Sequence, residues 1–231
     1  MSQEFDWAGV VDYARRHPVE SPRTQYELPG VTEEVHQEVA VAVVPLWHAV
    51  VTARLAFPVS DRDSLQLAQQ RLDAALAEVE AVYPLGPSGI FIQVAYGLPY
   101  FRERIPGKLA DEHMPRSTMA GSESQWAVID SIRFPKDPGG IVLESHEVCF
   151  HFKSDYRGHI ENVIDVLFRP GDPLLNGIPA ARAYLGGLFT VTTVRRGFAG
   201  RGMPKKMGVR LGIPGAESVP DGAMLFMGFT S

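Results

Sequence analysis

Residues 47–83 read "WHAVVTARLAFPVSDRDSLQLAQQRLDAALAEVEAVY" and predict a strand followed by a helix. Over 47–57 the apolar side chains alternate with polar ones, which is the period of a strand with one buried face. Ser60 or Asp61 can cap the helix, because a short side-chain oxygen accepts from the free N–H groups of a first turn. The helix over 61–83 carries an apolar stripe at helical spacing: Leu65, Ala68, Leu72, Ala75, Leu76, Val79 and Val82.

The same two periods recur on the C-terminal side of this segment. We expect strands over 88–98, 140–152 and 187–197, and a second helix over 154–168 that Ser154 or Asp155 caps. The order strand, helix, strand, strand, helix, strand is the split βαβ, or ferredoxin-like, arrangement. The sequence therefore predicts an α+β fold in which both helices cover one face of a four-stranded antiparallel sheet.

The chain divides by pattern into an N-terminal extension, 1–44, and one ferredoxin-like domain, 45–231. Two long loops interrupt the domain, at about 99–140 and 198–222, and a further extended piece follows the second loop at 223–229. Loops of this length in a compact domain usually serve a function or an interface.

Charge and cysteine content exclude some classes of protein. A net charge of −5 over 231 residues argues against a general nucleic-acid binder, which needs a basic face. The single cysteine, Cys149, rules out an intrachain disulfide and fits a reducing compartment. The N-terminus lacks the pattern of a signal peptide, and the longest apolar run, "VAVAVVPLWHAVVTA" (39–53), is too short to span a membrane. We expect a cytoplasmic protein with neither nucleic acid nor membrane as its partner.

The sheet face away from the two helices is the first candidate for a site. Alternation places these residues on it: Val50, Thr52, Arg54, Phe91, Gln93, Ala95, Cys149 and His151. For the last strand the pattern leaves two alternatives: Phe189, Val191, Thr193 and Arg195, or Thr190, Thr192 and Arg196. The mixture suits either a pocket wall or a partly wet interface between two sheets.

Two motifs within the domain could carry chemistry. In "SHEVCFH" (145–151) a strand places His146 opposite Cys149 and His151, so the three cannot share a metal ion. Cys149 and His151 are about 6–7 Å apart on one strand face. That separation favours a buried cysteine beside a hydrogen-bonded histidine over a catalytic pair. The segment "GFAGRGMPKKMG" (197–208) is glycine-rich and basic, and it is either a mobile surface loop or an anion-binding loop.

Three stretches resemble dye-decolorising peroxidases: "SGIFIQVAYGLPYF" (88–101), "GLFTVTTVRRGFAGRGMPKK" (187–206) and "GIPGAESVPDGAMLFMGF" (212–229). The resemblance implies one half of a dimeric α+β barrel-type fold, built from two ferredoxin-like halves with haem in one of them. "LFMGFTS" (225–231) looks like the start of the family's L-x-G-F-x-D-G motif, with Thr230 or Ser231 where the haem-facing aspartate stands. The family's haem histidine belongs to the second half, so no axial ligand is identified in this chain.

The resemblance gives the functional expectation. The chain is expected to be one half or subunit of a haem-dependent oxidoreductase acting on a small molecule, completed by a second chain or segment. The alternatives are a homodimeric α+β barrel that binds a small molecule without haem, and a non-catalytic partner subunit. The expected catalytic residues are Arg195, Arg196, Thr230 and Ser231; Arg54, Gln93, His151 and Phe229 are expected to contact the cofactor, and no metal site is predicted. Only one of Arg195 and Arg196 can face the site, so the other is expected in solvent or on a carboxylate.

Overall fold

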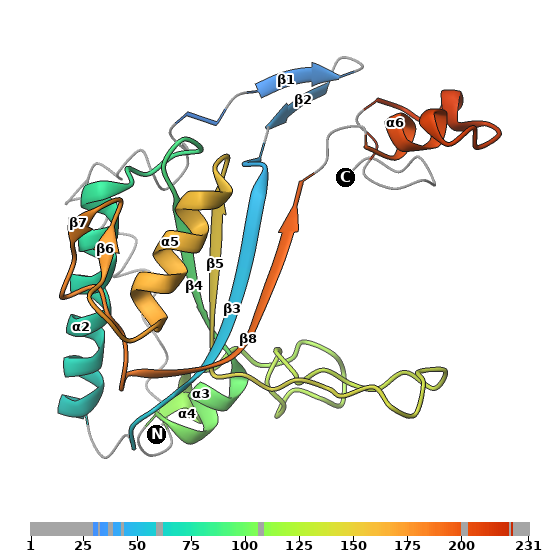
Figure 1. The fold of residues 1–231 in the computed structure, drawn as a ribbon. Helices are drawn as coiled ribbons and strands as arrows, with labels where there is room; N and C mark the ends of the chain where they lie inside the picture. Colours follow the sequence, from blue (N-terminus) through green and yellow to red (C-terminus); the bar gives the residue numbers. More distant parts are fainter. Residues whose placement is uncertain are drawn as a thin grey trace, which may run out of the picture.

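The computed structural model describes residues 30–31, 33–36, 39–42, 44–58, 62–105, 109–199, 203–221 and 223. Its main sheet has the strand order β4-β5-β3-β8, and each neighbouring pair is antiparallel. The sheet and its two main helices (Figure 1) comprise β3 (Trp47–Leu55), α2 (Arg62–Val82), β4 (Phe91–Tyr96), β5 (Val148–Ser154), α5 (Arg157–Phe168) and β8 (Phe189–Phe198). The ferredoxin-like α+β fold that the sequence predicts is confirmed.

The core lies between one face of this sheet and the two helices. Alternate residues of β5, such as Phe150 and Phe152, are fully buried, and α5 covers them with Val163 and Leu167. The predicted stripe of α2 contributes Leu72, Ala75 and Val79 to the same core. We call the opposite side of the sheet the open face, because neither main helix lies on it.

A β-bulge decides how β8 faces its neighbours. Thr52 pairs with Thr193, but the next residue, Ala53, pairs with Val191, so Thr192 is the extra residue. The alternation of β8 therefore reverses at this point. Phe189 and Val191 face the helices, whereas Thr193 and Arg195 face the open side together with Thr190. Neither of the two predicted sets is correct along the whole strand, because alternation alone cannot locate a bulge.

The structure corrects the prediction for residues 140–155. The third strand of the sheet begins at Val148 rather than at residue 140. Helix α5 begins at Arg157, and neither predicted cap serves it, because both side chains have other partners. The Ser154 hydroxyl donates to the carbonyl of Gly89 (2.6 Å), and the Asp155 carboxylate accepts the N–H of Leu46 (2.9 Å).

Smaller elements occur where the sequence showed no clear period. They are the hairpin of β1 (Glu33–His36) and β2 (Val39–Ala42), the helices α3 (Leu98–Glu103) and α4 (Leu109–His113), the hairpin of β6 (Leu174–Leu175) and β7 (Ile178–Pro179), and α6 (Met203–Arg210) with the 3-10 turn η2 (Ala216–Ser218). Helix α6 corrects the expectation that the glycine-rich segment 197–208 is entirely loop. The extended piece predicted at 223–229 lies outside the described residues except for Ala223.

A buried carboxylate connects the sheet to α3. Glu147, just before β5, is 2% exposed; one of its oxygens accepts the N–H of Leu55 (2.5 Å) and the other accepts from Arg104 (2.8 Å). Arg104 follows α3 and also donates to the carbonyls of Leu55 and Phe57. The end of β3 and the end of α3 are thereby fixed to one another.

Candidate ligand-binding cleft

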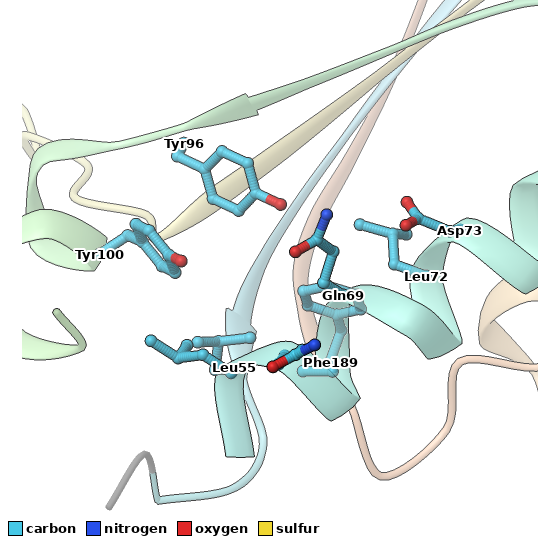
Figure 2. A pocket seen from close by; sticks show the side chains of 10 residues that line it. Leu55, Gln69, Leu72, Asp73, Tyr96, Tyr100 and Phe189 are labelled. Atoms are coloured by element: carbon cyan, nitrogen blue, oxygen red, sulfur yellow. The ribbon is translucent and has the colours of Figure 1, made fainter. Parts of the chain in front are cut away.

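A cleft of about 600 Å³ opens on the helix side of the sheet, between α2 and the ends of β3, β4 and β8 (Figure 2). This volume is in the range of small-molecule sites. Its lining residues come from five elements: Leu55, Leu65, Gln66, Ala68, Gln69, Leu72, Asp73, Tyr96, Tyr100 and Phe189. The cleft therefore lies on the opposite side of the sheet from the face on which the sequence placed the site.

The floor of the cleft is apolar. Leu55, Leu72 and Phe189 are each less than a tenth exposed, and they come from β3, α2 and β8. Leu65 and Ala68 continue the same stripe of α2 toward its N-terminal end, where they line the cleft and are only partly buried. The C-terminal part of the stripe packs in the core, whereas its N-terminal part is available to a ligand.

An aromatic wall faces α2. Tyr96 ends β4 and Tyr100 lies in α3, and their ring centroids are 4.5 Å apart with the planes inclined by 39°. Gly97 joins the two elements: a Cβ atom there would lie 2.1 Å from the carbonyl oxygen of His146. Only glycine allows this close turn, and the turn brings the two tyrosine rings together.

The rim of the cleft carries polar groups without protein partners. Gln69 and Asp73 project from α2, and the hydroxyls of Tyr96 and Tyr100 come from the opposite wall (Figure 2). Gln66 of α2 is a further polar lining residue. None of the five side chains forms a hydrogen bond or ion pair with another residue in the described part of the chain. An apolar floor beneath several free hydrogen-bonding groups is the usual composition of a small-molecule site.

Burial and neighbouring groups raise the pKa of both phenols further above neutral pH. Burial raises the pKa of the Tyr96 phenol, and the negative charge of Asp73 raises it further. Burial, with a smaller contribution from Tyr96, also raises the pKa of Tyr100. Both hydroxyls are therefore hydrogen-bond donors and acceptors at neutral pH.

On the open face, three of the predicted site residues lie in one row across the sheet. Gln93 pairs with His151, His151 pairs with Val50, and Val50 pairs with Arg195. Arg54 lies farther along β3, where its guanidinium donates to the carbonyl of Ser145 at 3.5 Å. The register confirms the prediction that Arg54, Gln93 and His151 share a face, and it places Arg195, one of the two alternatives on β8, on the same face. Contact of these residues with a cofactor stays a prediction.

The two arginines of β8 point to opposite sides of the sheet. Arg195 faces the open side and forms an ion pair with Glu144. Arg196 faces the helices and binds Glu161 of α5 through two hydrogen bonds, of 2.7 and 2.6 Å. Both arginines are thus held by carboxylates. The other predicted site residues, Phe229, Thr230 and Ser231, lie outside the described residues.

Cys149 and His151 do not form a catalytic pair. His151 forms its hydrogen bond with His48 of the neighbouring strand, at 3.1 Å between ring nitrogens. Burial raises the pKa of the Cys149 thiol, which disfavours the reactive thiolate. The half-buried cysteine beside a hydrogen-bonded histidine is the arrangement that the spacing favoured.

The residues of the cleft do not fit a haem group. The described lining residues include no histidine, cysteine or methionine, and a tyrosine would have to bind iron as a phenolate, which the raised pKa values disfavour. The one charged group there, Asp73, would repel the haem propionates. Among the described residues, moreover, no three side chains of His, Cys, Asp or Glu come together in a way that could hold a metal ion.

Sequence reasoning missed the residues that form the cleft. Two signals pointed to them: Gln66, Gln69 and Asp73 flank the apolar stripe of the first helix, and "YGLPY" (96–100) places two tyrosines four residues apart around a glycine and a proline. Neither signal shows that these residues line one cleft, because that depends on how α2, β4 and α3 are placed relative to one another in the fold.

Comparison with known proteins identifies a family and several structural likenesses. A family model described as "Family of unknown function (DUF7405)" matches residues 45–231. No curated protein matches the chain. A crystal structure of a DyP-type peroxidase from Cellulomonas bogoriensis superposes with a TM-score of 0.43 and 17% identity; the match covers 74% of this chain and 42% of that one. The chain thus spans less than half the length of that peroxidase. None of the helices in the described ranges is long and apolar enough to cross a membrane.

Proposed function

We propose that this protein, which belongs to DUF7405, a family of unknown function, binds a small molecule in the cleft. The ligand has an apolar body and a polar edge. The observation that carries this proposal is the set of five polar side chains that surround the apolar floor without a described protein partner. A ligand in the cleft would cover Leu55, Leu72 and Phe189 and bond to the rim.

A filled cleft tests the proposal. In a ligand-observed NMR screen of aromatic fragments that includes naphthylmethanol, wild-type protein should give binding signals. Ala68→Trp places a large ring in the cleft and should abolish them. Ala77→Trp, on the exposed side of the same helix, is the matched control and should leave them unchanged. Equal binding by wild type and Ala68→Trp, or no binder in the screen, would exclude the cleft as the site.

The haem-dependent oxidoreductase that the resemblance implies stays a separate prediction. It has no support from the cleft, and its expected terminal residues lie outside the described part of the chain. Adding haemin to the purified protein decides this question independently. A Soret band that shifts on binding and is lost in His151→Ala would support haem on the open face, whereas a spectrum that equals free haemin would reject it for this chain.

A second ferredoxin-like sheet is our proposal for the partner of the open face. Its support is the half-buried row through His151 and Val50, which neither α2 nor α5 covers. Light scattering tests whether a second copy supplies that sheet: the mass should be about twice 25.4 kDa for wild type, and Val50→Lys should reduce it to that of a monomer. A wild-type monomer at every concentration would reject the second copy.

A further inference from the structure

The carboxylate of Asp73 lines the cleft, and no described cation neutralises it. The positions three and four residues away hold Gln69, Gln70, Leu76 and Ala77, so no ion pair within the helix is available. The nearby Arg71 donates instead to the carbonyl of Gly186, at 3.2 Å. No described residue forms an ion pair with Asp73.

This charge acts on the interior of the cleft. Asp73 is the one formally charged residue among the described lining residues, and its field reaches the Tyr96 phenol on the opposite wall. A group bound between α2 and the tyrosines therefore experiences a negative potential from the carboxylate. The wall opposite Asp73 consists of the Tyr96 and Tyr100 rings, and an aromatic ring attracts cations to its face.

We propose that the cleft selects a ligand with a positively charged amine attached to an aromatic or other apolar body, and that the carboxylate of Asp73 attracts this amine. The amine lies toward Asp73 and the tyrosine wall, while the apolar body covers Leu55, Leu72 and Phe189. Anionic ligands of the same shape are rejected, since the rim offers them no described cation. This inference rests on the proposed function, because it assigns a ligand class to the same cleft.

Two probes that differ only in charge test the inference. Naphthylmethylamine is a cation at pH 7 and naphthylmethanol is its neutral counterpart of nearly the same shape. Calorimetric titration of wild type should give an affinity for the amine about three- to tenfold higher than for the alcohol, as expected for one partly exposed charge pair. That preference should decrease when the salt concentration is raised.

Asp73→Asn should remove the preference by weakening the amine about three- to tenfold while the alcohol binds as before. Glu80→Gln removes one charge from an exposed position of the same helix outside the cleft, and it should leave the preference intact. Equal affinities of wild type for both probes, or no effect of Asp73→Asn on the amine, would overturn the role of Asp73 while the cleft remains the site. If wild type bound neither probe, or if Ala68→Trp still bound both probes, the proposed function itself would be overturned.

Discussion

At the scale of single residues, His48 and His151 on the open face are joined by a hydrogen bond between their rings. The carbonyl of Pro45 can only accept a hydrogen bond, so Nε2 of His48, 2.9 Å away, carries a proton. Nδ1 of His48 and Nε2 of His151 are 3.1 Å apart, so one of these two nitrogens donates the proton of their hydrogen bond and the other accepts it.

The pH dependence of stability follows from His151. Burial, then the charges of Lys153 and His48, lower its pKa below the ordinary 6.5. The folded protein therefore binds fewer protons than the unfolded chain, and the stability from His151 is present above pH 6.5 and is lost as the pH falls through the folded pKa. Urea unfolding between pH 8 and 5 should show this decrease, and His151→Gln should make the curve flatter.

His113→Gln, an exposed histidine on α4, is the control for this experiment and should keep the wild-type dependence on pH. If His151→Gln retains the full decrease, then another group is responsible and the lowered pKa of His151 does not account for it.

At the scale of elements, Gly97 determines how β4 leads into α3. Its N–H donates to the carbonyl of Glu147 at 2.8 Å, and the close approach to His146 leaves no room for a side chain. Gly97→Ala should lower the free energy of unfolding by about 1–3 kcal/mol, because a methyl group there forces the backbone apart. Chemical denaturation measures this loss.

Gly158 gives the matched control, since a Cβ atom in this helical position meets nothing within 4 Å. Gly158→Ala should stabilise the protein by about 0.5–1 kcal/mol through helix propensity. If Gly97→Ala were as stable as wild type, the turn would be less restricted than the structure shows, and the pairing of Tyr96 with Tyr100 would not depend on glycine.

The bond between Arg104 and Glu147 gives the second prediction for elements. Arg104→Met leaves a carboxylate that is 3% exposed without its cation, which should cost about 2–4 kcal/mol. Arg102→Met breaks the exposed pair with Asp130 and should cost less than about 1 kcal/mol. Thermal unfolding of the two variants compares them directly, and equal losses would show that Glu147 is stable without Arg104.

At the scale of the whole molecule, the fold follows from the sequence because its elements carry clear periods. The stripe through Leu72 and Val79 and the alternation around Phe150 predict which faces meet in the core. Other features depend on contacts that no local pattern encodes. The bulge at Thr192 is defined by the pairing of β8 with β3. Glu144, which the sequence pattern places in a strand, instead forms an ion pair with Arg195 of β8.

The candidate site was harder to predict than the fold for the same reason. Alternation correctly grouped Gln93 and His151 on one sheet face and left Arg195 and Arg196 as alternatives, but it could not show that a cleft forms on the other face. Two long-range hydrogen bonds, from the N–H groups of Leu55 and Gly97 to Glu147, hold the aromatic wall of the cleft in place. Residues that meet through such contacts are recognised only once the chain is folded.

The most direct test of the cleft is to determine which residues of the protein a bound ligand contacts. NMR spectra of protein with labelled tyrosine rings report on all seven tyrosines separately, once Tyr→Phe variants assign Tyr96 and Tyr100. Adding naphthylmethylamine should shift the ring signals of these two residues in a saturable way, while the signals of Tyr83 and Tyr184, outside the cleft, stay in place. Unchanged signals of Tyr96 and Tyr100, or larger shifts at Tyr83, would contradict the account.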